Sequence, residues 1–105
     1  MSKLTINTKD IIETIISKGH QDRTYRQIYK QNNLKLKIEI KSDSYRRQCY
    51  AHAYALDGLE WKLIYSIPYS EMKTPEGLYY QNNLNEALFF ADRDQLRQKL
   101  NEILF

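Results

Sequence analysis

Cysteine, proline and glycine are scarce in this chain of 105 residues, which contains one, two and three of them respectively. A single cysteine excludes an internal disulfide bond and fits a cytoplasmic setting. The longest uncharged stretches, such as residues 48–56, span about nine residues, whereas a membrane-spanning helix needs roughly 20 apolar residues. The first residues, MSKLTINTKD, lack the apolar segment of a signal peptide. These absences predict one soluble domain covering residues 1–105, with no membrane partner.

Residues that could support catalysis or metal binding are also few. Three glycines cannot build a glycine-rich phosphate loop. Cys49 and His52 suggest a nucleophile and its base, but residues three apart in a strand point to opposite faces. His20 and Asp22 lie close in sequence without further ligands at a spacing that would hold a metal. We therefore expect a non-enzymatic protein with no catalytic residue, no metal site and no cofactor.

The charge of the chain is unevenly distributed, although the net charge is only +3. Residues 1–47 contain 11 Lys or Arg against 5 Asp or Glu, whereas residues 48–105 contain 5 against 8. A basic half of this kind can mark a surface for an anionic partner. The alternative is a soluble domain whose charges serve no partner.

Residues 45–67 predict a long β-hairpin, because Asp57-Gly58 is typical of a two-residue turn between strands. Side chains alternate between the two faces of a strand, so this pairing gives an aromatic face and a plain face. The aromatic face holds Tyr50, His52, Tyr54, Leu56, Leu59, Trp61, Leu63 and Tyr65. The plain face carries the row that we call the alanine lane: Cys49, Ala51, Ala53 and Ala55. The bulk of the aromatic face predicts that it is the core face.

A second hairpin is predicted earlier in the chain. Apolar residues alternate with charged ones over residues 34–41, which is typical of a half-buried strand. Residues 24–31 are rich in Tyr, Thr and Ile and predict a strand, although residues 25–29 also fit a helical spacing. A two-residue loop at Asn32-Asn33 gives these cross-strand pairs: Tyr29 with Leu36, Gln27 with Ile38, Tyr25 with Ile40, and Arg26 with Glu39.

The connection between the two hairpins decides which residues share a face. A two-residue turn at Ser42-Asp43 would place the apolar row of residues 34–40 on the face of the alanine lane. To keep the aromatic face as the core, we predict a three-residue loop or a β-bulge between residues 42 and 48.

Helices are predicted at both ends of the chain. Isoleucines at positions 11, 12, 15 and 16 form an apolar stripe over residues 8–18, which ends before Gly19. Asp92 and Gln95 are typical of a helix start, so we expect a break near residues 91–94 and a helix over about 93–104. Residues 78–80 fit a short edge strand.

The predicted fold class is therefore α+β. An N-terminal helix precedes an antiparallel meander of three to four strands, at about 24–31, 34–41, 45–56 and 59–67, and a C-terminal helix follows. Both helices are expected to pack on the aromatic face.

The opposite sheet face is the predicted binding surface. It collects seven basic residues: Arg26, Lys30, Lys35, Lys37, Lys41, Arg47 and Lys62. Basic residues along a sheet face can hold a phosphate backbone through salt-sensitive contacts. Single-strand binders also expose aromatic residues for stacking, and here the aromatic face is assigned to the core. We expect a small binding module for an acidic partner, either a nucleic acid or an acidic protein surface.

The alternative is a protein–protein interaction module, such as an adaptor, inhibitor or accessory subunit. The alanine lane, together with Ile28 and Ile64, could receive a helix from a partner or a second copy. Edge strands could also pair in a homodimer, and Tyr69, Tyr79 and Tyr80 are typical interface anchors. A further possibility is that the chain's own C-terminal helix covers the alanine lane.

Overall fold

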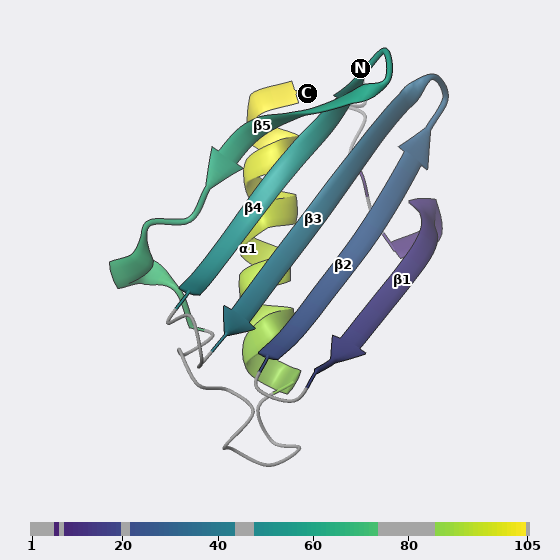
Figure 1. Ribbon diagram of the computed structural model, residues 1–105. Helices are drawn as coiled ribbons and strands as arrows, with labels where there is room; N and C mark the ends of the chain where they lie inside the picture. The colour runs from purple at the N-terminus through teal and green to yellow at the C-terminus, as the bar shows by residue number, and fades with distance from the viewer. Residues whose placement is uncertain (1–5, 7, 20–21, 44–47, 74–85, 105) are drawn as a thin grey trace.

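The computed structural model describes residues 6, 8–19, 22–43, 48–73 and 86–104, which form a curved sheet with one helix packed against it (Figure 1). The elements in chain order are η1 (Thr8–Asp10), β1 (Ile11–Lys18), β2 (Asp22–Gln31), β3 (Leu34–Asp43), β4 (Gln48–Asp57), β5 (Glu60–Ser66), η2 (Tyr69–Glu71) and α1 (Glu86–Leu104). The strands form one antiparallel sheet in the order β1-β2-β3-β4-β5. The α+β class is confirmed, but the sheet has five strands rather than three or four. The predicted strand at residues 78–80 lies outside the described residues.

The hairpin of β2 and β3 has the pairing that the sequence predicts. Its loop is Asn32-Asn33, and Asn32 has a φ of 56°, in the left-handed region that asparagine tolerates better than most residues. Every predicted pair is present: Tyr29 with Leu36, Gln27 with Ile38, Tyr25 with Ile40, and Arg26 with Glu39. The local turn and the alternating pattern therefore determine this hairpin.

Pairing between β3 and β4 runs without a bulge from Leu36–Ala55 to Asp43–Gln48. Ile38 faces Ala53 in this ladder, so the apolar row of β3 lies on the face of the alanine lane. The predicted change of register is wrong for the paired residues, and residues 44–47 lie outside the described part of the chain. An even number of connecting residues preserves the face assignment that a two-residue turn would give.

The turn between β4 and β5 lies one residue later than predicted. Asp57 pairs with Glu60, so the two-residue loop is Gly58-Leu59 rather than Asp57-Gly58. Gly58 has a φ of 65° and Leu59 has a negative one, which fits the preference of type II′ turns for glycine at the first central position.

A β-bulge at Ile64 divides β5 between the two faces of the sheet. Tyr54 pairs with Leu63, but Ala53 pairs with Tyr65, so one extra residue of β5 lies between these pairs. Tyr65 therefore lies on the face of the alanine lane and not in the aromatic row to which the regular hairpin assigned it.

The N-terminal helix predicted over residues 8–18 is wrong, because residues 11–18 form β1 at the edge of the sheet beside β2. Four of the eight residues of β1 are isoleucine, whose branched Cβ disfavours helix and favours strand. In this strand Ile12, Ile15 and Ile16 are 54%, 37% and 45% exposed. β1 is thus an edge strand with apolar side chains in solvent.

The C-terminal helix α1 runs unbroken from Glu86 to Leu104, so the predicted break near residues 91–94 is wrong. Asp92 lies inside the helix, where its buried carboxylate accepts a hydrogen bond of 2.9 Å from the N–H of Lys73. This bond ties the segment after η2 to the helix. Phe89, Leu96 and Leu100 are buried at helical spacing and form the stripe that meets the sheet.

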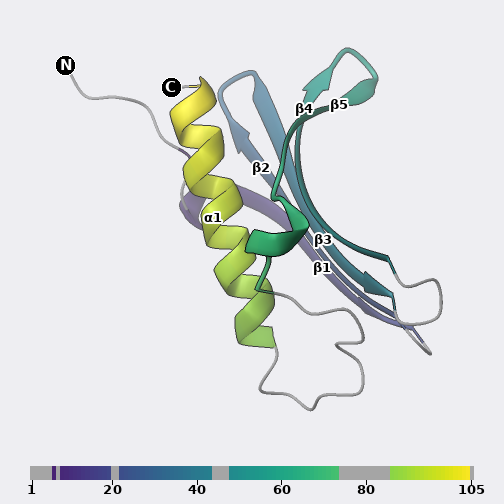
Figure 2. The same ribbon diagram turned by 90° about the vertical axis from the view of Figure 1, so that its left-hand side faces the viewer.

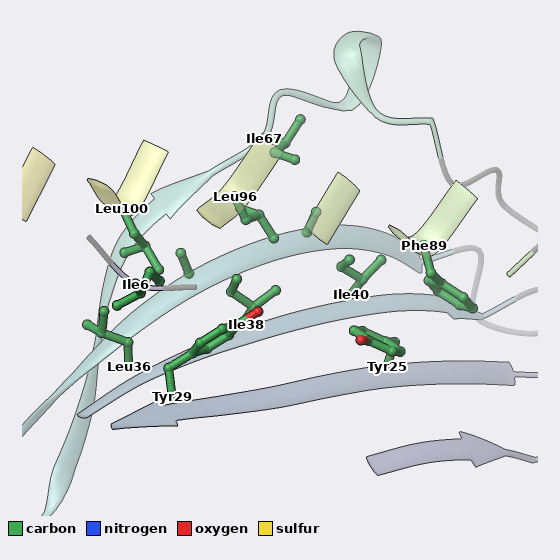
Figure 3. Close-up of a cluster of buried hydrophobic side chains, with 12 residues drawn as sticks. Ile6, Tyr25, Tyr29, Leu36, Ile38, Ile40, Ile67, Phe89, Leu96 and Leu100 are labelled. Carbon is green, nitrogen blue, oxygen red and sulfur yellow. The ribbon is translucent and has the colours of Figure 1, made fainter. Parts of the chain in front are cut away.

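The core lies between α1 and the face of the alanine lane (Figure 3). α1 packs chiefly against β3, β4 and β5. Ala51 and Ala53 are fully buried, and their small side chains leave room for the helix against the sheet. The expectation that helices pack on the aromatic face is wrong, and the possibility that the chain's own helix covers the alanine lane is confirmed.

The segment before β1 is also tied to the end of the helix. The buried Ile6 donates its N–H to Asn101 Oδ1 at 2.8 Å, and Asn101 Nδ2 lies 3.4 Å from the carbonyl oxygen of Ile6. One amide side chain thus satisfies both backbone groups of a buried residue.

Candidate nucleic-acid interface

The sheet face turned away from α1 carries no other element in the described part of the chain (Figure 2). Strands β3 and β4 bow towards the helix, so this face, which we call the open face, is concave. Cross-strand pairing assigns its main rows: Thr24, Lys41 and Tyr50; Arg26, Glu39 and His52; Ile28, Lys37, Tyr54 and Leu63. Basic residues of β2 and β3 and aromatic residues of β4 and β5 therefore share one surface.

Five of the seven predicted binding residues come together on the open face: Arg26, Lys30, Lys35, Lys37 and Lys41. Lys62 is not among them, because it pairs with Ala55 on the other face and lies 3.1 Å from the carboxylate of Glu60. Arg47 lies outside the described residues. The sequence predicts that the basic residues lie beside the alanine lane. In the structure, the five residues of the open face lie beside the aromatic row instead.

Four carboxylates share the open face with these five cations, which leaves a net charge of +1: Glu13, Asp22, Glu39 and Asp43. Glu39 is compensated directly, because its Oε1 accepts a hydrogen bond of 2.7 Å from Arg26 Nη2. This bond raises the pKa of the Arg26 guanidinium, against the opposing effect of burial. The four lysines therefore supply the positive charge that an anion would meet.

Tyr50, His52 and Tyr54 follow one another along β4 and contact each other. The His52 ring stacks on Tyr50 with centroids 4.3 Å apart and meets Tyr54 edge-on at 5.7 Å. His52 Nδ1 and Tyr54 Oη share a hydrogen bond of 2.8 Å. His52 is therefore half-buried between the two tyrosines.

The electrostatics of this aromatic row keep it uncharged near neutral pH. Burial lowers the pKa of His52, although the charge of Glu39 opposes this effect, so the imidazole is neutral at pH 7. Burial also raises the pKa of Tyr50 to about 12 and raises the pKa of Tyr54. A neutral strip of rings therefore lies alongside the lysines of β3.

Lys37 joins the basic and the aromatic parts of the surface. Its ammonium lies 4.6 Å from the ring centroid of Tyr54 and 4.8 Å from that of Trp61, within the range of cation–π attraction. Burial among these groups lowers the pKa of Lys37, against the opposing charge of Glu39. Two rings on neighbouring strands thus direct their faces at one point.

The aromatic residues of the open face are the part of the site that sequence reasoning missed. Their bulk suggested a core, and the correct signal was the run of alanines at alternate positions on the same strand. A lane of small side chains is where a helix can pack closely, so it indicates the covered face. The rings then belong to the uncovered one.

The residue pair that suggested catalysis is separated by the sheet. Cys49 pairs with Ser42 on the face of the alanine lane, whereas His52 pairs with Glu39 on the open face, as their spacing predicts. Within the described ranges, no group of three or more His, Cys, Asp or Glu could hold a metal ion. The described part of the chain also has no helix long and apolar enough to cross a membrane.

Fold and surface together define a small α+β domain whose antiparallel sheet is covered by a helix on one face and, as far as the described residues extend, uncovered on the other. No protein-family model matches the chain, and comparison with curated proteins and with solved structures finds no match either. The chemistry of the open face is therefore the basis on which a function can be assigned.

Proposed function

We propose that this protein is a non-enzymatic, cytoplasmic binding module that holds a nucleic acid on its open face. The observation that carries the proposal is the gathering of four lysines and Arg26 beside an aromatic row on one concave surface. Lysines contribute sequence-independent affinity for phosphates, and aromatic rings offer bases a surface for stacking. Nucleic acid is favoured over an acidic protein because it combines a regular line of anions with flat bases.

The test is the affinity for a fluorescent oligonucleotide, measured by anisotropy at increasing salt. Each phosphate contact to a single strand contributes about −0.7 to the slope of log K against log salt, so the four lysines predict a slope of up to about −2.8. Wild-type protein that binds no oligonucleotide at about 50 mM salt would overturn the proposal, because electrostatic binding is strongest there.

Two double charge reversals distinguish binding through this face from binding that depends only on the net charge of the protein. Lys35→Glu with Lys41→Glu changes the open face, whereas Lys62→Glu with Lys73→Glu makes the same change at exposed positions elsewhere. The first variant should reduce the salt slope by about 1.4, corresponding to two lost contacts, and weaken binding at least roughly tenfold. The second should behave like the wild type. Equal losses in both variants would show that net charge, not this face, holds the oligonucleotide.

A second candidate function, self-association through β1, is favoured by the three exposed isoleucines of this edge strand. Ile15 lies opposite Arg26 on the open face, whereas Ile16 lies opposite Tyr25 on the other face. A strand that paired with the edge of β1 would place its own side chains on both faces of the sheet, beside Ile15 and beside Ile16. A helix would pack on one face only. The alanine lane no longer serves as a groove for a partner, because α1 covers it.

Analytical ultracentrifugation tests this second candidate. Ile15→Lys should convert a dimer to a monomer, and Leu59→Lys at the exposed hairpin tip should leave the dimer intact. A wild-type protein that sediments as a monomer at high micromolar concentration would exclude pairing through β1.

A further inference from the structure

We propose that the open face selects single-stranded over duplex nucleic acid, and that an unpaired base takes the place of the Lys37 ammonium between Tyr54 and Trp61. This inference rests on the proposed function. It adds the strandedness of the ligand and the position of one base.

The proposed place for the base is the point above Tyr54 and Trp61 that the Lys37 ammonium occupies. This ammonium lies over both aromatic rings, and the distances of 4.6 Å and 4.8 Å limit the separation of the two ring centroids to 9.4 Å. A base between two rings needs roughly 7–8 Å, twice the usual contact distance of about 3.5–4.0 Å between carbon atoms. The two rings come from neighbouring strands, since Trp61 pairs with Leu56, two residues beyond Tyr54. The sheet itself therefore positions the two walls of the site.

The Lys37 ammonium can leave its place between the rings, and a base gains stacking contacts by entering it. A lysine side chain is a flexible stem with a compact charge, so its ammonium can move aside while its backbone remains in β3. A phosphate next to the base would then receive this charge. The lowered pKa of Lys37 reflects the water that the ammonium loses among the rings, and contact with a phosphate would compensate that loss. Stacking of a base on an aromatic ring is also typically stronger than an exposed cation–π contact.

Duplex nucleic acid cannot use this site, because its bases are paired and stacked within the helix. Entry of a base from a duplex would require unpairing and unstacking. A duplex could contact only the lysines, whereas a single strand could contact the lysines and also place a base between the rings.

Trp61 makes the proposal directly measurable, because it is the only tryptophan of the chain. Its emission reports on stacking, and the anisotropy of a labelled oligomer reports on binding. The probes are oligothymidylate of about 12 nucleotides, an abasic oligomer of that length and a duplex of that length. The abasic oligomer keeps every phosphate but has no bases.

Oligothymidylate should quench Trp61 and bind roughly 5- to 150-fold more tightly than either the abasic oligomer or the duplex, the range expected for one base stack. Trp61→Leu should bring the affinity for oligothymidylate close to that for the abasic oligomer. Leu59→Ala, a change at the exposed hairpin tip outside these rows, should preserve the difference. An oligouridylate arm adds an RNA probe, and quenching by either polymer supports the inference.

The outcomes separate this inference from the proposed function. Equal binding of all three probes to the wild type, with unchanged Trp61 emission, would overturn the inference and leave binding through phosphates intact. Failure of every probe to bind would overturn both. The comparison of probes uses the wild-type protein, so it decides the question even if the Trp61 variant does not fold.

Discussion

Replacement of Ala53 by arginine tests which face of the sheet is the core. Ala53 is fully buried in the alanine lane, where it faces Ile38 on β3 and Tyr65 on β5. If α1 covers this lane, Ala53→Arg forces a long charged side chain into the layer between helix and sheet. If the lane were the solvent face, the same change would be harmless.

The magnitude follows from two contributions. Extra volume in a packed core costs about 1–3 kcal/mol. A buried guanidinium without a partner adds several kcal/mol more, so the total is about 5 kcal/mol. A domain of this length has a free energy of unfolding of roughly 5–15 kcal/mol, so Ala53→Arg removes a large part of it. Ala53→Leu adds volume without charge and should cost about 1–3 kcal/mol.

Urea denaturation followed by circular dichroism measures both variants. At a slope of about 1–3 kcal/mol per M, Ala53→Leu should lower the midpoint by roughly 1 M, and Ala53→Arg should leave little or no folded baseline. The control is Leu63→Arg, which places the same side chain at a residue that is 55% exposed on the open face. This change should stay within about 0.5 kcal/mol of the wild type.

Two results would refute the reasoning. One is an Ala53→Arg variant with the urea midpoint of the wild type, which would mean that the alanine lane faces solvent. The other is a loss in Leu63→Arg as large as that in Ala53→Arg, which would mean that both faces are covered.

Three further predictions concern single residues. Gly58→Ala should lower Tm by about 4–8 °C, the shift that corresponds to about 1 kcal/mol. No atom lies within 4 Å of an added Cβ, so the cost arises from the φ of 65°, which is strained for any residue with a side chain. An unchanged Tm would contradict the left-handed turn. Burial raises the pKa of Tyr29 to about 12 from 10, so the neutral phenol contributes about 2–3 kcal/mol to the free energy of unfolding; this contribution is complete below pH 10 and is lost between pH 10 and 12. Tyr29→Phe should therefore make the free energy of unfolding fall less steeply over this pH range, and an equally steep fall would refute this. Asn101→Ala should cost about 1–3 kcal/mol and speed hydrogen exchange at the Ile6 amide, which loses its acceptor, whereas unchanged exchange would place that acceptor elsewhere.

The sequence predicts elements well where the deciding signals are local. The turn at Asn32-Asn33 and the alternation of residues 34–40 both lie within the β2–β3 hairpin, and together they determine its pairing. Residues 11–18 show the limit of such signals, because isoleucines at positions 11, 12, 15 and 16 fit a helical stripe as well as a strand. The partner that decides the outcome is β2, and residue spacing within β1 does not reveal it.

The face assignment failed because it depends on packing rather than on pattern. Tyr50, Tyr54 and Trp61 have the bulk of a core, yet the helix requires a lane of small side chains opposite it. The length of the connection between β3 and β4 then decides which row of β4 shares a face with the apolar residues of β3. Four residues lie between the paired Asp43 and Gln48, and this number places the apolar residues of β3 on the face of the alanines. The basic residues were predicted to share a face with one another, and five of them do. Their aromatic neighbours could not be assigned before that connection was known.

The order of the strands has a consequence for synthesis on the ribosome. Each strand pairs with the next one in the chain, so the entropic cost of closing each loop is small. Every hairpin can therefore form as soon as its second strand is available. The helix that covers the alanine lane is made only after all five strands. At about 5–20 residues per second, the stretch from the end of β5 to the end of α1 takes roughly 2–8 s to translate. During that interval the nascent sheet exposes its isoleucine and alanine rows, and exposed apolar surface of this kind favours aggregation during synthesis.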